Sequence, residues 1–192
     1  MNGSQDIARK WGIDKPHVTF MQYNQIEGTN TNAVAVRSVL NGKNTGRLYV
    51  LLWRDGLDKL KRGLSAFDYT CDHLQIVSRY ERIALHHSVM RSWNFEDDID
   101  MRFSNGVTAV LYAIQSGAKT VIISGINPNS TGHAYNDANL PRSHVDRDRD
   151  ILMKIHENGF PLFTADPTVA KTLGLPLWTR EAADCLNVTG TK

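Results

Sequence analysis

The stretch 102-RFSNGVTAVLYAIQSGAKTVIISGINP-128 carries the clearest structural pattern in the chain. Apolar residues recur in it at positions i, i+3, i+4 and i+7, which predicts a helix with one apolar face. Those residues are Val107, Val110, Leu111 and Ile114. Gly117 stands where a glycine commonly ends a helix, and the β-branched run 120-TVIISG-125 follows at once. A helix that leads straight into a strand is half of a βαβ unit.

Strand and helix patterns alternate along most of the remaining chain. Strands are predicted at 18–24, 47–55, 74–80 and 161–166. Helices are predicted at 33–42, 56–67 (with Gly63 as a weak point), 143–159 and 168–174, and a short helix with a loop at 83–100. This alternation predicts an α/β fold with a doubly wound, mostly parallel, Rossmann-like sheet. We expect residues 1–16 to be a loose polar arm and residues 17–192 to form a single α/β domain.

The composition of the chain excludes several classes of protein. Of its 192 residues, 41% are apolar and 22% charged, as in an ordinary globular protein. The net charge of +2 is too small, and the Lys and Arg residues too scattered, to indicate nucleic-acid binding. No apolar run approaches the roughly 18–20 residues of a membrane span, and the N-terminus does not resemble a secretory signal. These features favour a cytoplasmic protein with Cys71 and Cys185 as reduced thiols, and leave a peripheral membrane contact and a homo-oligomer open.

Polar loops follow the predicted strands, where ligands of open parallel sheets bind. The loops 24-NQIEGTNTN-32 and 125-GINPNSTGHAYND-137 are two of them. In addition, Ser104, Asn105 and Gly106 open the predicted helix over 107–116, whose free N–H groups suit a phosphate. Simple capping of the helix by Ser104 or Asn105 is the alternative. The chain has no GxGxxG and no P-loop lysine pattern, so these loops do not indicate an ordinary dinucleotide or P-loop site.

His144 is the histidine with the most suggestive position. Ser143 is a plausible N-cap and Asp146 follows three residues later, which resembles a capping box. On the first helical turn the helix dipole is expected to lower an imidazole pKa and favour the neutral form, which a general base requires. Asp148 stands one turn later and could orient the ring. The alternative is a surface histidine in a charged helix. No group of residues has the ligand spacing of a structural zinc site.

Residues 102–178 resemble the bacterial sialyltransferases typified by the Campylobacter lipooligosaccharide enzymes. That family opens a helix with an Arg and a Ser/Thr-Gly turn, follows it with a strand ending in Gly-Ile-Asp, and then has a tyrosine, a histidine at a helix start, and a last strand and helix. The matching residues here are 102-RFSNG-106, Gly117, 125-GIN-127, Tyr135, 143-SH-144 and 161-PLFTADPTVAKTL-173. The first part of this pattern is also similar to the wider pterin pyrophosphokinase-like families.

The resemblance implies a variant glycosyltransferase fold that transfers an acidic sugar from a CMP-sugar to a glycan acceptor, as in bacterial lipopolysaccharide biosynthesis. It implies no metal and no cofactor beyond the donor substrate. It also implies a role for each matching residue. His144 would be the general base and Arg102 would lie near the reacting groups, while the donor would be bound by Ser104, Asn105, Gly106, Asn127 and, at the leaving phosphate, Tyr135.

The chain departs from that family on its N-terminal side, where no strand precedes Asn2-Gly3-Ser4. We expect Asn24, Asn30 and Asn32 to supply part of the nucleotide pocket, because amide side chains both donate and accept hydrogen bonds. A surface loop rich in turn-forming asparagine is the alternative. Two other functions stay open: a phosphotransferase or other nucleotide enzyme on the same fold, and a non-catalytic binding domain.

Overall fold

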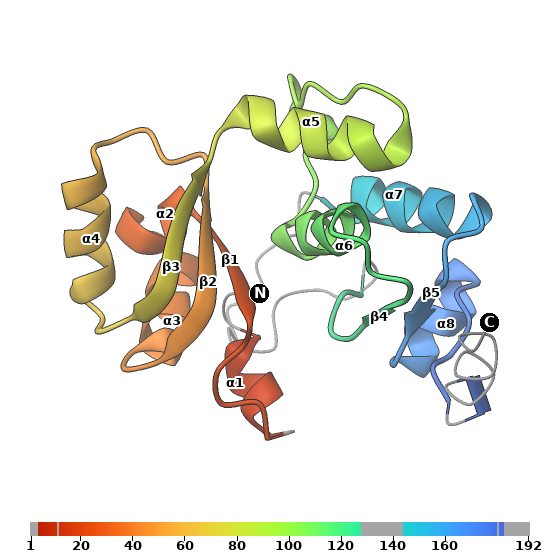
Figure 1. Cartoon of the computed structure of the whole chain (residues 1–192), viewed down its shortest axis with the longest axis horizontal. Coiled ribbons are helices and arrows are strands. Elements are labelled where there is room, and N and C mark those ends of the chain that lie inside the picture. Colours follow the sequence, from red (N-terminus) through yellow and green to blue (C-terminus); the bar gives the residue numbers. More distant parts are fainter. Residues whose placement is uncertain (1–3, 11, 128–143, 180, 183–192) are drawn as a thin grey trace. The chain divides into compact units, whose positions relative to one another are not determined.

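The computed structural model describes residues 4–10, 12–127, 144–179 and 181–182. These residues group into two compact units, with the division between Leu85 and His86. Unit 1 holds the described residues up to Leu85, and unit 2 holds those from His86 onward. Both units alternate helices with parallel strands, so the α/β class predicted from the sequence is confirmed (Figure 1). The prediction of a single domain over 17–192 stays a prediction.

Unit 1 is built on a three-stranded parallel sheet in the order β1-β2-β3. The strands are β1 (Val18–Gln22), β2 (Asn44–Leu51) and β3 (Thr70–Val77). The helices of this unit are α1 (Gln5–Arg9), α2 (Tyr23–Glu27), α3 (Thr31–Leu40) and α4 (Leu57–Ser65). The strands pair in sequence order, each with the next along the chain, which is the arrangement that βαβ crossovers produce.

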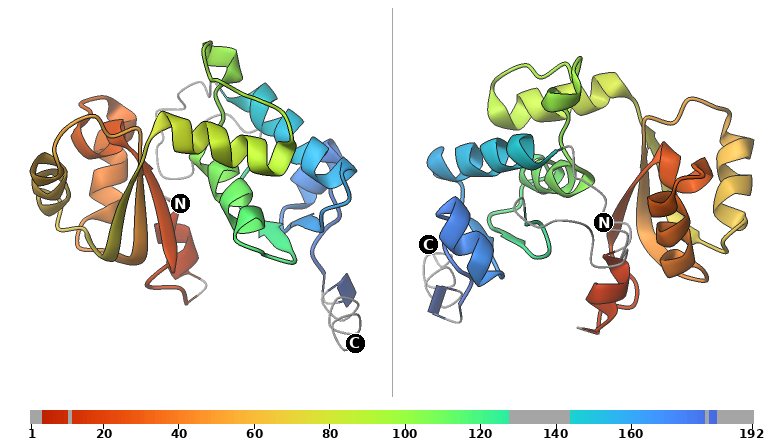
Figure 2. Two further views of the ribbon diagram at one scale, coloured as in Figure 1. Left: turned by 45° about the horizontal axis from the view of Figure 1, so that its top comes forward. Right: turned by 180° about the vertical axis from the view of Figure 1, so that it is seen from behind.

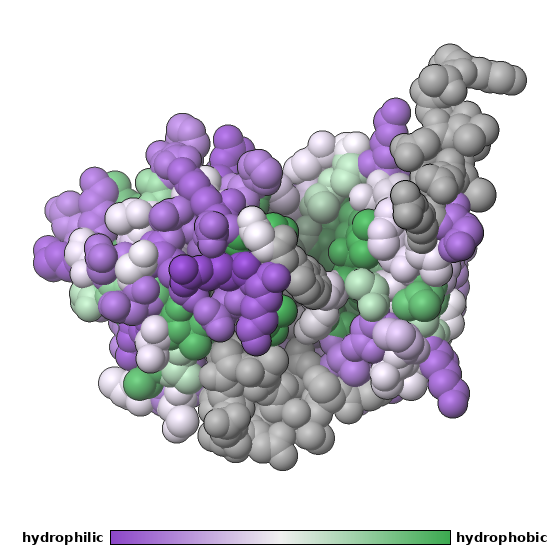
Figure 3. All heavy atoms as spheres, turned by 90° about the horizontal axis from the view of Figure 1, so that it is seen from below, coloured by the Kyte–Doolittle hydropathy of each residue, from purple (hydrophilic) through white to green (hydrophobic). Residues whose placement is uncertain are grey.

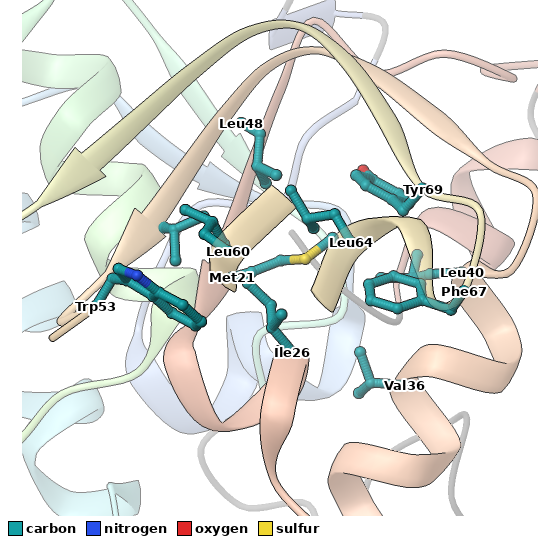
Figure 4. Close-up of a cluster of buried hydrophobic side chains, with 11 residues drawn as sticks. Met21, Ile26, Val36, Leu40, Leu48, Trp53, Leu60, Leu64, Phe67 and Tyr69 are labelled. Carbon is teal, nitrogen blue, oxygen red and sulfur yellow. The ribbon is translucent and has the colours of Figure 1, made fainter. Parts of the chain in front are cut away.

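The core of unit 1 lies between its sheet and helices α2, α3 and α4. Met21 of β1 is completely buried at its centre, between Ile26 of α2 and Leu64 of α4 (Figure 4). The other labelled members of this cluster are Val36, Leu40, Leu48, Trp53, Leu60, Phe67 and Tyr69. Outside the core, the surface of unit 1 seen from below is mostly hydrophilic, with small hydrophobic patches (Figure 3). Leu60 and Leu64 of the helix predicted over 56–67 therefore face inward, whereas Leu57 is 48% exposed.

Several features of unit 1 differ from the sequence-based expectations. Strands β2 and β3 begin at Asn44 and Thr70, before the predicted positions 47 and 74, and β3 ends at Val77 because α5 begins at Arg79. The first strand ends at Gln22 rather than residue 24, because Gln25 Oε1 accepts a hydrogen bond from Gln22 N–H at 2.8 Å and starts the helix α2 within the predicted loop. The polar arm is not loose. Gln5 is buried, its Nε2 donates to Asn44 O at 2.6 Å, and its Oε1 accepts from the Tyr69 hydroxyl at 3.1 Å. Buried polar partners of this kind fasten α1 to the sheet.

Unit 2 contains a two-stranded parallel sheet of β4 (Val121–Ile123) and β5 (Leu162–Thr164). Helix α5 (Arg79–Met90) crosses from unit 1 into it, and the 3-10 helix η1 (Ile99–Met101), α6 (Asn105–Gln115), α7 (Val145–Glu157) and α8 (Pro167–Leu173) follow. The described strands thus pair as two small sheets. The sequence predicts one sheet, and strand partners are decided by packing that periodicity does not encode.

The helix predicted in the opening stretch is confirmed as α6. Three residues of its apolar stripe, Val107, Val110 and Leu111, are buried, and the helix ends before Gly117, which has a left-handed φ of +88°. Helix α7 begins at Val145, so that His144 occupies the N-cap position rather than the first turn. Figure 2 shows α6 and α7 side by side in both of its views.

Candidate functional site

The entrance to α6 is closed by a serine cap. Ser104 Oγ accepts a hydrogen bond from Val107 N–H at 3.2 Å, and Ser104 O accepts from the Thr108 hydroxyl at 3.0 Å. These bonds satisfy backbone and side-chain groups at the first turn, as helix caps do. The capping role that the sequence offered as the alternative for Ser104 is therefore confirmed. The nucleotide-binding role of the same turn stays a prediction.

Asp148 joins the entrance of α6 to the first turn of α7. Its side chain is 3% exposed, and Oδ1 accepts a hydrogen bond from Ser104 N–H at 2.8 Å. Its own backbone N–H donates to His144 O at 2.8 Å. The side chain of Asp148 thus binds the predicted nucleotide turn, and its backbone N–H makes the first helical hydrogen bond of α7, to the carbonyl of His144. The structure brings Ser104 and His144, which lie 40 positions apart in the sequence, to one place in unit 2.

Gly106 brings the loop after β4 to the same entrance. A Cβ atom at Gly106 would lie 3.1 Å from Cδ1 and Cγ1 of Ile126, which is tighter than ordinary packing. Ile126 is buried and stands three residues after the end of β4, directly before Asn127. The glycine thus allows a close approach of the loop, and a side chain there would need Ile126 to shift. We refer to Ser104, Asn105, Gly106, Asn127, His144 and Asp148 as the α6 entrance cluster.

The charge at this entrance is set by Asp148. A carboxylate beside the first N–H groups of a helix is stabilised by the helix dipole and by its hydrogen bond to the backbone. Because Asp148 already accepts from Ser104 N–H, a ligand phosphate would not find that amide available and would meet a negative charge beside it. Arg102 is exposed two residues before Ser104 and is the predicted site residue with a positive charge.

The asparagines predicted to bind the nucleotide lie in unit 1. Asn30 caps α3, where its Oδ1 accepts from Ala33 N–H at 2.8 Å, and Asn32 stands in the first turn of that helix. Asn24 stands within α2, and its carbonyl oxygen accepts from Gly28 N–H at 2.7 Å. Asn30 thus serves as the N-cap of α3, a role that the sequence did not predict. Tyr135, the predicted phosphate ligand, lies outside the described residues.

His86 is a buried histidine that the sequence did not single out. It is 1% exposed, its Nδ1 lies 3.0 Å from Ser92 O, and its ring centroid lies 5.7 Å from that of Phe103. Burial lowers the pKa of His86, and the nearby positive charges of Arg147 and Lys154 add to that effect, while the Ser92 carbonyl opposes it. Nothing in the local sequence distinguishes His86 from its neighbour His87, because burial here depends on residues far along the chain.

The described part of the chain contains neither a metal-ligand cluster nor a helix that could span a membrane. Within residues 4–10, 12–127, 144–179 and 181–182, no three side chains of His, Cys, Asp or Glu gather as metal ligands would. None of the helices described there is long and apolar enough to cross a membrane. Cys71 carries a free, half-buried thiol, and burial raises its pKa, which does not favour a reactive thiolate.

Comparison of the chain with protein-family models, with curated proteins and with solved structures gives no match, so a functional assignment rests on the residues described above.

Proposed function

We propose that the chain is a sialyltransferase-like glycosyltransferase that uses a CMP-activated acidic sugar and His144 as general base, on a Rossmann-like fold. The observation that carries the proposal is the hydrogen bond from Ser104 N–H to Asp148 Oδ1, which ties the entrance of α6 to the first turn of α7, one turn after His144. Two parts of the motif that resembles the sialyltransferases are thereby held at one entrance.

The position of the α6 entrance cluster also supports this proposal. Asn127 stands in the loop beyond β4, and α7 begins in the following chain, so the cluster lies where ligands bind in parallel α/β sheets. In the proposed reaction an acceptor hydroxyl attacks the anomeric carbon of the sugar, and the bond from that carbon to the CMP phosphate oxygen breaks. His144 takes the hydroxyl proton, and CMP leaves with the electron pair of the broken bond.

The buried carboxylate restricts how the donor is held. Asp148 disfavours the phosphate at the Ser104 amide, so we assign the entrance turn to the uncharged ribose or sugar hydroxyls. The leaving phosphate is assigned to Tyr135, as the resemblance implies, and exposed Arg102 is proposed as the cation of the site. Asn24, Asn30 and Asn32 lie in unit 1 and remain separate predictions as nucleotide ligands, and the Oδ1 of Asn30 already caps α3.

Asp148 also favours a second candidate, a non-catalytic binding domain. A helix entrance whose first amide donates to the protein's own carboxylate resembles a structural cap more than an anion site. On this alternative the fold is kept and the donor is not bound. The phosphotransferase alternative has no comparable support among the described residues.

A thermal-shift panel tests the proposal and separates the alternatives. The ligands are CMP, CDP, UDP, GDP and CMP-sialic acid, each with and without magnesium. A ligand at about one hundred times its Kd stabilises a protein by about 2.7 kcal/mol, which raises Tm by several degrees for a chain of this size. We expect the shift to be selective for CMP compounds and independent of magnesium. A magnesium-dependent shift with other nucleotides favours a phosphotransferase, and no shift with any ligand favours the binding domain.

The general-base role predicts the effect of His144→Ala. Release of CMP from CMP-sialic acid, measured with a panel of glycan acceptors, should fall by about 10²–10⁴-fold, because general-base catalysis contributes about that much. Donor affinity and Tm should change little. His156→Ala is the matched control, since His156 stands in the last turn of the same helix α7. Unchanged turnover in His144→Ala would remove the base assignment.

A further inference from the structure

The loop between α5 and η1 exposes two large aromatic side chains. We define residues 91–101, which include η1, as the aromatic loop. Trp93 is 60% exposed and Phe95 is 53% exposed. Their rings are nearly parallel, at 8°, with centroids 6.0 Å apart. His87 of α5 stacks on Trp93 with a centroid distance of 3.9 Å. Two aromatic rings held together in solvent indicate a surface that meets a partner.

Hydrogen bonds hold this loop in one conformation. Asn94 is 3% exposed, its Nδ2 donates to Met101 O at 2.8 Å, and its Oδ1 accepts from Glu96 N–H at 3.0 Å. At the start of the loop, Ser92 O accepts from Nδ1 of the buried His86 at 3.0 Å. Asn94 thus closes the loop on itself and leaves the neighbouring aromatic rings outside. A preorganised loop loses less conformational entropy on binding than a free one.

Backbone strain marks the same segment. Arg91 has a φ of 55° and Glu96 a φ of 52°, in the left-handed region that non-glycine residues rarely adopt. Arg91 stands two positions before Trp93, and Glu96 directly follows Phe95. Such conformations persist where the surrounding structure enforces them, and they cluster at ligand clamps. Arg91 directly follows α5, where a left-handed residue commonly ends a helix, and Glu96 N–H donates to Asn94 Oδ1, so both conformations are held by their local structure.

The charge of the loop identifies the chemistry of its partner. Residues 96–100 contain four carboxylates and no lysine or arginine, and three of them, Asp97, Asp98 and Asp100, are exposed. Asp98 stands three residues after Phe95, which limits their Cα separation to about 11 Å. Arg91 is the first residue of the loop and Arg102 directly follows it. Even with both arginines counted, the net charge of the segment is negative. Aromatic faces and carboxylates both attract cations, and carboxylates repel nucleic acid and anionic membranes.

We propose that the aromatic loop is a docking surface for a basic, apolar segment of another protein, whose arginine or lysine side chains stack on Trp93 and pair with Asp98 and Asp100. This surface uses no residue of the α6 entrance cluster, so it stands or falls independently of the glycosyltransferase proposal. The parallel rings supply the apolar contact, and the carboxylates supply orientation and a faster encounter.

Selection of peptides on the intact chain tests the proposal. The probe is a displayed library of random 12-residue peptides, selected against the immobilised full-length protein and then measured singly by fluorescence anisotropy. We expect the recovered peptides to be rich in Arg or Lys next to apolar residues. Trp93→Ala should weaken their binding about 30-fold or more, as at an interface hot spot. Phe95→Ala should weaken it by a similar or smaller factor.

Matched variants separate docking from loss of the fold. Tyr80→Ala removes an aromatic side chain that is 82% exposed but lies outside the loop, and should leave peptide binding unchanged. The double variant Asp98→Asn with Asp100→Asn should weaken binding several-fold at low salt and reduce its salt dependence. The Tm of each variant, and its response to CMP, should match those of the unchanged protein.

Four results would overturn the docking proposal. The first is recovery of no peptide above background. The second is binding of the recovered peptides to Trp93→Ala and to Phe95→Ala as tightly as to the unchanged protein. The third is binding of anionic or neutral phospholipid vesicles that Trp93→Ala abolishes, which would assign the loop to a membrane surface. The fourth is concentration-dependent self-association, measured by sedimentation, that Trp93→Ala abolishes, which would make a second copy of the chain the occupant.

Discussion

His86 shows, at the scale of single residues, how burial makes the fold sensitive to acid. Its Nδ1 lies against Ser92 O, which fixes the ring so that Nε2 carries the lone pair. Nε2 is buried and has no hydrogen-bond partner among the described residues. Protonation would place a positive charge and an unsatisfied donor in that position, close to Arg147 and Lys154. The neutral imidazole is therefore the form that the folded protein accepts.

This arrangement predicts a loss of stability below about pH 6.5. The pKa of His86 is lowered on folding, so the unfolded chain takes up a proton at a pH where the folded chain does not. The contribution of the neutral His86 to the free energy of unfolding is complete above pH 6.5. It declines as the pH falls, by at most about 1.4 kcal/mol for each pH unit. His86→Leu should lower Tm at every pH and flatten its dependence between pH 7 and 5. The exposed His73 is the control, because His73→Gln should leave that slope unchanged.

The bond between Asp148 and Ser104 predicts different effects for two substitutions. Asp148→Ala leaves the Ser104 N–H without its acceptor, and a hydrogen bond to a charged group contributes about 1.5–3 kcal/mol. Asp148→Asn keeps an oxygen in the same place and should cost less. Urea unfolding should therefore rank the free energies of unfolding as unchanged protein, Asn variant, Ala variant. Equal values for the two variants would show that the Ser104 contact contributes little.

At the scale of elements, the presence of Gly63 within a helix is explained only by the packing of the folded structure. The sequence marks it as a weak point in the helix that becomes α4. A Cβ atom there would lie 2.6 Å from Ile26 Cγ2, closer than such atoms approach in proteins. The glycine is therefore required by the packing of α4 on α2, even though glycine costs a helix about 1 kcal/mol relative to alanine.

This contact predicts a change of sign between two backgrounds. Gly63→Ala alone should destabilise the protein by about 1–3 kcal/mol, because the overpacked core must move against Ile26. In the Ile26→Ala background the methyl group has room, and the same substitution should stabilise by about 1 kcal/mol through helix propensity. Chemical denaturation of the four proteins of this cycle gives both values. A destabilising effect of equal size in both backgrounds would place the conflict elsewhere.

The elements show which local signals in a sequence are reliable. The apolar stripe of α6 and the glycine after it were predicted, because three or four residues on one face are enough to define a helix. The end of β1 was missed, because Gln22 and Gln25 form a glutamine cap that resembles an ordinary polar loop. The start of α7 was misplaced by one residue, since Ser143 was expected as the N-cap and His144 occupies that position without a side-chain cap hydrogen bond.

At the scale of the whole molecule, the sequence predicts the class of fold but not which strands pair or which distant residues make contact. Alternating strand and helix patterns suffice for an α/β assignment, and parallel pairing is confirmed in both sheets. The separation into two small sheets was not predicted. Ser104 was predicted as part of the site, yet its bond to Asp148 joins residues 44 positions apart. Contacts of that range arise from tertiary packing, and a single sequence carries no local signal for them.

The edge position of β3 bears on how the protein behaves at high concentration. Among the described residues, β3 pairs with β2 alone, which makes it an edge strand of its sheet. Asp72 and His73 are exposed along it, and Asp72 forms an ion pair with Lys15 at 2.7 Å. Charged side chains on an edge strand oppose the approach of another strand. The polar character of β3 thus acts against aggregation, keeping a sheet that is open at its side from growing into a fibre.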